Sequence, residues 1–173
     1  CNYSGEWHRD HKQGKGRMFW FDGASYDGQW KNDVRDGYGI FLYANGDEYI
    51  GQWSNNVQHG KGEYRFADGD IYVGEYAYGQ RSGYGEYTLA DGSKYIGEYR
   101  NGDIEGRGRY EMPSGEVYDG EWRENKRHRR GAKHALAALK SVIYGEHVTE
   151  DCKKTCHVAQ TVTCADAADV VEA

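Results

Sequence analysis

Proline, cysteine and long hydrophobic runs are scarce in this chain of 173 residues. It has one Pro and four Cys, and no apolar run approaches the ~20 residues that a membrane helix needs, so any membrane contact is expected to be peripheral. The cysteines form no disulfide framework, which indicates an intracellular, cytoplasmic location. Because the chain begins at Cys1 and shows no leader segment, we expect a fragment or a processed piece of a longer protein.

Glycine and aromatic residues are abundant instead, and they recur with a period of 23 residues. A tyrosine opens each repeat, at Tyr3, Tyr26, Tyr49, Tyr72, Tyr95 and Tyr118. In the first five copies a Gly-x-Gly pair follows eleven residues later, and then a turn dipeptide such as Asp22-Gly23 or Asn45-Gly46. Such strict phasing is typical of an ordered repeat array rather than of a flexible low-complexity chain.

Each repeat has the period-two pattern of β-strands. Tyr26, Gly28 and Trp30 are two residues apart and would project from one face of a strand, while Asp22-Gly23 is typical of a chain reversal. Aromatic rings are expected to lie against glycines of the neighbouring strand, where the missing side chain leaves room for them. The sequence therefore predicts an all-β fold, an elongated single-layer antiparallel meander of 23-residue β-hairpin repeats.

The repeat resembles that of the MORN repeat proteins. The resemblance is carried by Tyr49-Ile50-Gly51-Gln52-Trp53, followed by His59-Gly60-Lys61-Gly62, and by Tyr95-Ile96-Gly97-Glu98-Tyr99. It covers residues 3 to about 122 and implies a rod-like antiparallel meander. It also implies scaffolding, cytoskeletal or membrane-associated roles, including attachment modules on lipid kinases and protein methyltransferases. Tyr76 and Tyr99 depart from the pattern, because they stand in place of Trp.

Four segments follow from these patterns. Residues 1–122 hold five to six MORN-like hairpin repeats, and the array is expected to stop after Trp122 because Arg129 stands where Gly is due. Residues 123–134 are expected to be a basic connector. Residues 135–145 have the spacing of an amphipathic α-helix that would cap the sheet, with dimerisation or a membrane surface as alternatives. Residues 146–173 form a tail that is partly helical or disordered and to which we assign no role.

No set of residues points to catalysis. The histidines, carboxylates and cysteines form no catalytic constellation, and His59 is expected in a turn between hairpins. Cys152, Cys156, His157 and Cys164 lack the paired spacing of a structural zinc site and are expected to be ordinary thiols, with a zinc site between two chains as the alternative. We therefore expect no enzyme activity, no cofactor and no metal.

Two surfaces of the sheet are candidates for binding a protein partner. Aromatic anchors are expected on one face, at Tyr26, Trp30, Tyr49, Trp53, Tyr72, Tyr76, Tyr95 and Tyr99. An apolar stripe is expected on the opposite face, at Phe19, Ile40, Leu42, Ile50, Val73 and Ile96. Aromatic residues are common at binding hot spots, and exposed apolar patches usually mark contacts. Alternatively, the rings hold the fold together, and long polar neighbours cover the stripe.

Charge is distributed unevenly along the chain. Residues 1–122 carry 13 basic and 21 acidic residues, whereas residues 123–134 carry six basic and one acidic residue. The six basic residues could bind anionic lipid: Arg123, Lys126, Arg127, Arg129, Arg130 and Lys133. The alternative is a solvated connector that also interacts with the acidic repeats. Nucleic acid is not expected as a partner, because the acidic surface would repel phosphate.

The sequence thus predicts a non-catalytic repeat scaffold that docks or tethers proteins at membrane or cytoskeletal structures. The expected partner is a helix or an extended segment of another protein, and a second copy of this chain is the alternative. Two further hypotheses stay open: peripheral binding of anionic phospholipids such as phosphoinositides through the basic residues, and a regulatory fragment of a larger enzyme.

Overall fold

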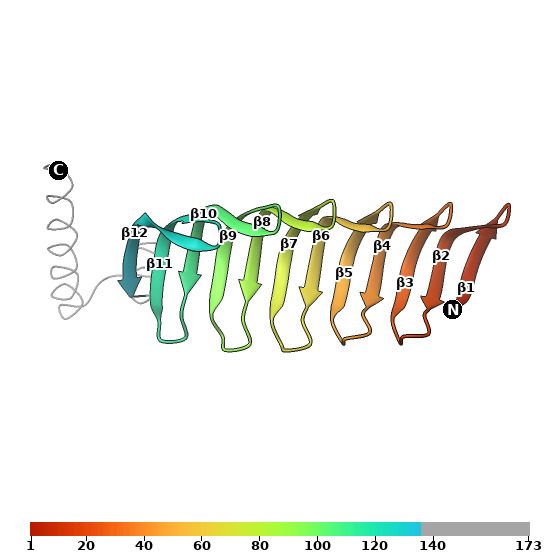
Figure 1. The fold of residues 1–173 in the computed structure, drawn as a ribbon, viewed down its shortest axis with the longest axis horizontal. Coiled ribbons are helices and arrows are strands. Elements are labelled where there is room, and N and C mark those ends of the chain that lie inside the picture. The colour runs from red at the N-terminus through yellow and green to blue at the C-terminus, as the bar shows by residue number, and fades with distance from the viewer. Residues whose placement is uncertain (136–173) are drawn as a thin grey trace, which may run out of the picture. The chain divides into compact units, whose positions relative to one another are not determined.

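The structure of the protein, a computed structural model, describes residues 1–135, with side chains for residues 1–128. These residues form one sheet of twelve strands, arranged in chain order from β1 to β12 (Figure 1). The strands are β1 (Asn2–His8), β2 (His11–Phe19), β3 (Ser25–Lys31), β4 (Val34–Leu42), β5 (Glu48–Ser54), β6 (Val57–Arg65), β7 (Ile71–Ala77), β8 (Gln80–Thr88), β9 (Lys94–Arg100), β10 (Asp103–Glu111), β11 (Glu116–Arg123) and β12 (Lys126–Ala135). The predicted single-layer antiparallel meander of hairpins is confirmed.

Two kinds of connection alternate along the sheet. The longer loops carry the turn dipeptides seen in the sequence, and in the first of them the backbone N–H of Ala24 donates to the side chain of Asp22 at 3.0 Å. The other connections are tight two-residue turns, in which both residues are left-handed, for example Asn32 (φ 48°) and Asp33 (φ 69°). This left-handed pair matches the right-handed twist of the flanking strands. Only the longer loops carry the turn dipeptides from which turns were predicted.

The sixth hairpin is complete, which corrects the expectation that the array stops after Trp122. Glu124 and Asn125 form the tight turn, with φ angles of 49° and 63°, and β12 follows beside β11. The hydroxyl of Tyr118 donates to the carbonyl of His128 across this hairpin at 2.7 Å. Because strands pair through backbone groups, Arg129 in place of Gly does not prevent the pairing. Most of the expected basic connector, residues 123–134, is therefore strand.

The predicted C-terminal helix lies outside the described residues, except for Ala135, which ends β12. The predicted tail, residues 146–173, lies outside them entirely.

His59, expected in a turn, lies in β6 with its ring 6.4 Å from that of Tyr78.

Alternate residues of each strand divide the sheet into two faces, which we call inner and outer. The repeated tyrosines and tryptophans lie on the inner face, and the ring of each of the first five tyrosines fills a space left by two glycines on adjacent strands. A Cβ atom added at Gly51 or Gly62 would overlap the ring or hydroxyl of Tyr49. The predicted role of these glycines as sockets is confirmed, and it explains how a sheet of one layer can have a core.

The first glycine of each Gly-x-Gly pair has a different role. Gly37 has a φ of 105° and lies where the register between β3 and β4 shifts between Gly28 and Trp30. This bulge leaves the N–H of Tyr38 without a strand partner, and the side-chain oxygen of Gln29 accepts its hydrogen bond at 2.6 Å. The bulges recur near the tight turns, where Figure 1 shows the strands bending.

Candidate partner-binding site

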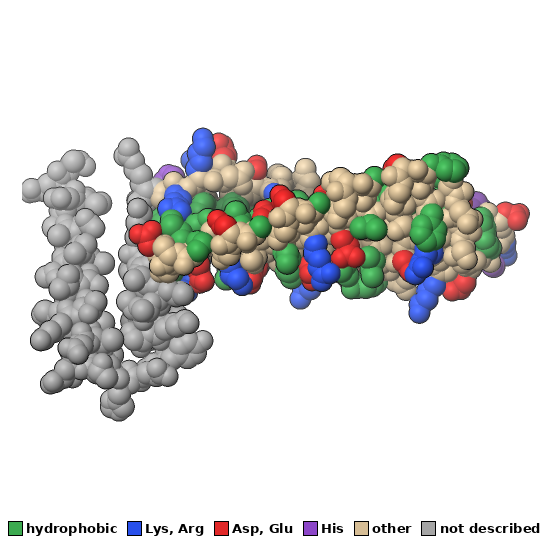
Figure 2. All heavy atoms as spheres, turned by 90° about the horizontal axis from the view of Figure 1, so that it is seen from below, with side chains coloured by type: hydrophobic (Ala, Val, Ile, Leu, Met, Phe, Trp, Pro, Cys, Tyr) green, Lys and Arg blue, Asp and Glu red, His purple; other side chains and the backbone are tan. Residues whose placement is uncertain are grey.

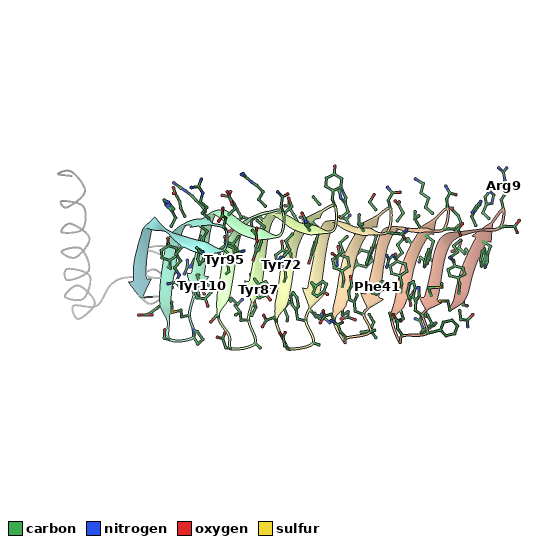
Figure 3. The ribbon with its side chains drawn as sticks, viewed as in Figure 1. Arg9, Phe41, Tyr72, Tyr87, Tyr95 and Tyr110 are labelled. Atoms are coloured by element: carbon green, nitrogen blue, oxygen red, sulfur yellow. The ribbon has the colours of Figure 1, made fainter. Side chains whose placement is uncertain are left out.

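The eight predicted aromatic anchors are buried in the core of the sheet. The exposed fraction of each side chain is 6% or less, for Tyr26, Trp30, Tyr49, Trp53, Tyr72, Tyr76, Tyr95 and Tyr99. Figure 3 shows Tyr72 and Tyr95 lying along the sheet in successive repeats. A partner could contact these rings only after the sheet had opened, so we assign them a structural role.

Each of the first five repeated tyrosines links two neighbouring repeats. The ring of Tyr26 packs edge-to-face against Trp30 of its own strand and Trp53 of the next repeat, with centroids 5.2 and 5.5 Å apart. Its hydroxyl donates to the carbonyl of Gln29 at 3.0 Å, and the indole N–H of Trp30 donates to the carbonyl of Gly16 at 2.9 Å. Burial raises the pKa of Tyr26 to about 12, so the phenol is neutral at physiological pH.

Two core side chains lack the indole donor, because Tyr76 and Tyr99 replace the tryptophan of the repeat. The hydroxyl of Tyr99 is also buried without a hydrogen-bond partner among the described residues. In the next repeat, the indole N–H of Trp122 donates to the carbonyl of Gly108 at 3.0 Å. The change from Trp to Tyr in the preceding repeat removes that donor, so this hairpin is a weak point of the core.

Cationic side chains cover the edge of the inner face. The guanidinium carbon of Arg35 lies 4.5 Å from the ring centre of Trp53, and that of Arg81 lies 5.4 Å from Tyr99. Arg127, one of the six residues of the predicted lipid site, lies 5.9 Å from the ring centre of Trp122. Burial lowers the pKa of Arg35. These cations stack on rings of the core, as expected for cation–π contacts.

The predicted lipid site is thereby divided. Arg127 is engaged with the core, whereas Arg123 and Lys126 are exposed beside the last tight turn. Arg129, Arg130 and Lys133 belong to β12, and their side chains lie outside the described ones. Seen from the edge that carries the longer loops, acidic, basic and hydrophobic side chains are interspersed along the array (Figure 2).

The predicted apolar stripe lies on the outer face, in two separate rows. Strand register pairs Ile40 with Ile50 and places Glu63 and Val73 in the same row, which then continues to Glu86 and Ile96. Phe19 and Leu42 lie in a second row, each opposite Ser25. The stripe is therefore not continuous, because Glu63 and Glu86 separate Ile50, Val73 and Ile96 from one another.

Three members of the stripe line one groove on the outer face, from β4 to β9. The groove has a volume of about 700 Å³, and its floor is the backbone of paired glycines whose other side carries the core tyrosines. One wall carries the stripe residues Ile50, Val73 and Ile96 together with Glu63 and Glu86. The opposite wall carries Tyr38, Lys61, Glu75 and Tyr84. We call this feature the outer groove.

The tyrosines of the outer groove were missed by the sequence analysis. Tyr38 and Tyr84 are 56% and 59% exposed, so both rings are available to a partner. They stand between the two glycines of their Gly-x-Gly pairs, at the position that Lys61 occupies in the third repeat. The other copies carry a polar residue at this position. The two tyrosines could therefore have been noticed in the sequence as a departure from the repeat pattern.

Three glutamates line the outer groove. Glu63 is bound by Arg65 at 2.7 Å and Glu86 by Lys94 at 2.6 Å, but Glu75 has no ion-pair partner within 4.0 Å among the described residues. Lys61 is the single basic residue that lines the groove. Since Arg65 and Lys94 pair with two of the three carboxylates, Glu75 is the glutamate of the groove that has no ion-pair partner among the described residues.

Comparison with known proteins identifies the repeat. The MORN repeat model matches residues 3–25, 26–48, 49–71, 72–94, 95–117 and 118–132. The chain belongs to the MORN repeat family. The sixth match agrees with the complete sixth hairpin of this MORN array. MORN repeats are in general non-catalytic, and they are consistent with a repeat scaffold.

Other comparisons add little to this result. A comparison with curated proteins found no match. Among solved structures, the chain is similar to the "SAS-4 (dCPAP) TCP domain in complex with a Proline Rich Motif of Ana2 (dSTIL) of Drosophila Melanogaster". The sequence identity is 14% and the TM-score 0.29, over 70% of this chain and 83% of that chain.

A second row of aromatic rings runs along the inner face of the MORN array. Neighbouring centroids are 4.4 to 5.7 Å apart, through Trp20, Phe41, Tyr43, Tyr64, Phe66 and Tyr87. The hydroxyl of Tyr64 donates to Asp47 at 2.8 Å, and the same carboxylate accepts the N–H of Ala67 at 2.8 Å. This row joins successive longer loops, so it extends the core rather than forming a groove.

The described part of the MORN array offers no cluster of three or more metal-ligand side chains. The predicted thiol cluster lies outside residues 1–135, which leaves that prediction untested.

No helix among the described residues is long and apolar enough to cross a membrane.

Proposed function

We propose that this MORN array is a non-catalytic docking scaffold that binds a protein partner in the outer groove. The observation that carries the proposal is the groove itself, where Ile50, Val73 and Ile96 lie beside the exposed rings of Tyr38 and Tyr84. Apolar side chains that the fold does not bury usually mark a contact surface. Tyrosine is frequent at such contacts, because it buries a large area and keeps a polar tip.

The difference in exposure between the two faces of the sheet supports the same proposal. The inner face is filled by its own rings, whereas Val73 on the outer face is 49% exposed. Binding on the outer face requires no change in the core. A cytoplasmic location, at membrane or cytoskeletal structures, is part of the proposal because a rigid rod of repeated hairpins suits tethering.

A second candidate function is peripheral binding of anionic phospholipid by residues 123–133, favoured by the net charge of +5 over residues 123–134. Replacing Arg123 and Lys126 by Ala should then abolish co-sedimentation with phosphoinositide vesicles at physiological salt. Unchanged sedimentation of this variant would remove the candidate.

Site-specific crosslinking tests the docking proposal. A photoreactive phenylalanine derivative is placed at Val73, and in a control chain at Phe21, a loop residue that is 95% exposed. A partner captured at Val73 and not at Phe21 is then purified, and its affinity for the full chain is measured by calorimetry. We expect Val73→Arg to weaken that affinity at least tenfold.

Val57→Arg is the matched control, because Val57 is 41% exposed and does not line the groove. The docking proposal fails if the two arginine variants weaken the purified partner equally, or if neither does.

A further inference from the structure

The spacing of the outer groove restricts the conformation of a partner segment. Ile50, Val73 and Ile96 lie on β5, β7 and β9, so each is two strands from the next. At ~4.8 Å per strand this separation is ~9.6 Å. Tyr38 on β4 and Tyr84 on β8 are four strands apart, or ~19 Å. A segment that runs along the groove therefore meets an apolar side chain of this row every ~9.6 Å.

Of the regular backbone conformations, polyproline II matches this repeat best. It has three residues per turn and rises ~3.1 Å per residue, so one face recurs every ~9.3 Å. A β-strand returns to the same face every ~6.8 Å, and an α-helix does so every ~10.5 Å over seven residues. Over the two intervals from Ile50 to Ile96 the error is ~0.6 Å for polyproline II and ~1.8 Å for the helix.

The chemistry of the walls agrees with such a segment. A polyproline II backbone makes no hydrogen bonds of its own, so its carbonyls can accept from the hydroxyls of Tyr38 and Tyr84 and from the ammonium group of Lys61. Exposed tyrosine rings in grooves pack against proline rings. The glycine floor lets a backbone approach closely, because no side chain rises from it.

Charge adds a requirement for basic residues. Glu63, Glu75 and Glu86 line the groove, and Glu75 has no ion-pair partner within 4.0 Å in the described part of the chain. A lysine or arginine of the partner near Glu75 would gain a charge-assisted contact without breaking an existing pair. An acidic group of a partner at the same place would be repelled by Glu75.

We infer that the outer groove binds a basic polyproline II segment in which every third residue is apolar. The span from Ile50 to Ile96 covers four strand spacings, or ~19 Å, which requires about seven residues in this conformation. The inference rests on the proposed docking function, since it names the class of partner for that same groove.

Three synthetic peptides test the inference against the full chain carrying isotope-labelled methyl groups. The first is Arg-Pro-Leu-Pro-Pro-Leu-Pro-Pro-Leu-Arg. The second has the same composition with its three leucines adjacent, and the third is an amphipathic helical peptide of equal charge with leucine at heptad spacing. We expect the first peptide to bind at least tenfold more tightly than the other two. Its largest shifts should fall on the methyl groups of Ile50, Val73 and Ile96.

Two variants test whether side chains of the groove walls bind the first peptide. Replacing Tyr38 and Tyr84 together by Ala should weaken the first peptide at least tenfold, and Glu75→Gln should weaken it about threefold and reduce its salt dependence. Tyr78→Ala is the control for the rings, because Tyr78 is 87% exposed and lies outside the groove. It should leave the affinity unchanged.

Each contrary result has a distinct meaning. Equal binding of the first two peptides, or binding of none, overturns the polyproline II inference. Tighter binding of the helical peptide with the same methyl shifts also overturns it, yet leaves the docking function standing. Docking itself is judged by the purified partner and the Val73→Arg variant, so the two failures can be told apart.

Discussion

The two faces of the sheet are built from alternate residues of the same strands, yet they differ in how much they vary between hairpins. On the inner face, all six copies begin with a tyrosine whose hydroxyl donates to the carbonyl three residues later. The outer residue that follows this tyrosine varies, being Ser4, Asp27, Ile50, Val73, Ile96 and Asp119 in the six copies. The glycine sockets therefore constrain the inner face, whereas the outer face can vary between hairpins without changing the core.

Filling a glycine socket on the inner face should give the largest loss of stability. Gly62→Val places a side chain in the ring of Tyr49, and we expect a loss of about 3 kcal/mol or more in the free energy of unfolding, measured in urea. Gly102→Asn is the control, because a Cβ atom there meets no atom within 4 Å and Asn56 takes the same left-handed turn position in another hairpin. The control should lose less than about 1 kcal/mol.

Alkaline pH should give the next largest loss of stability, through the buried tyrosines of the inner face. Burial raises the pKa of Tyr26 and Tyr72 to about 12. Below pH ~10 these phenols are protonated in both the folded and the unfolded chain, so stability should not change with pH. Between pH ~10 and ~12 only the unfolded chain loses the protons, so stability should fall as pH rises. Urea midpoints measured from pH 8 to pH 12 check this, and a constant midpoint would contradict it.

Removing single hydroxyls should separate a satisfied core group from an unsatisfied one. Tyr72→Phe deletes a donor to the carbonyl of Glu75 and should lower the unfolding free energy by about 1 kcal/mol. Tyr99→Phe deletes a buried hydroxyl without a partner and should be neutral or slightly stabilising. Thermal and urea unfolding of both variants give the comparison. Equal losses would mean that the Tyr99 hydroxyl is hydrogen-bonded in solution.

Restoring the tryptophan should repair the weak hairpin. In Tyr99→Trp the indole N–H can donate to the carbonyl of Gly85, as Trp122 does to Gly108, and we expect a gain of about 1 kcal/mol. The reverse change, Trp53→Tyr, removes the bond to Gly39 and should lose a similar amount. Destabilisation by Tyr99→Trp would show that the space around this residue has closed.

The smallest effect on stability is expected on the outer face. Val73 is 49% exposed, so Val73→Arg should change the unfolding free energy by no more than about 0.5 kcal/mol. Calorimetric melting checks this value. A larger loss would make the variant unsuitable as a test of docking. It would also mean that the outer face contributes to the stability of the fold.

Much of the fold could be predicted, because the period of 23 residues and the alternation of Tyr26, Gly28 and Trp30 depend on local geometry alone. The tight turns were missed because Asn32-Asp33 and its counterparts often lack the glycine that marks a turn. The sixth hairpin was missed for a related reason. Arg129 breaks the side-chain pattern, but backbone pairing does not need that pattern.

The candidate site was harder to predict from sequence. Period-two alternation shows which residues share a face, but it cannot show that Tyr49 and Trp53 are covered by their own neighbours. The outer groove depends on register across several strands, and register places Tyr38 and Tyr84 beside Ile50, Val73 and Ile96. Bulges shift that register by two residues in each of the first five hairpins, which the side-chain pattern does not reveal.

The central claim is that the inner face alone holds the fold. The measurement that tests it most directly is urea unfolding of a triple variant in which Ile50, Val73 and Ile96 are all Ser, beside the single variant Trp53→Ala. We expect the triple variant to lose at most about 2 kcal/mol, and Trp53→Ala to lose about 3–5 kcal/mol, in the free energy of unfolding. A triple variant less stable than Trp53→Ala would mean that the outer groove is part of the core and would contradict the account.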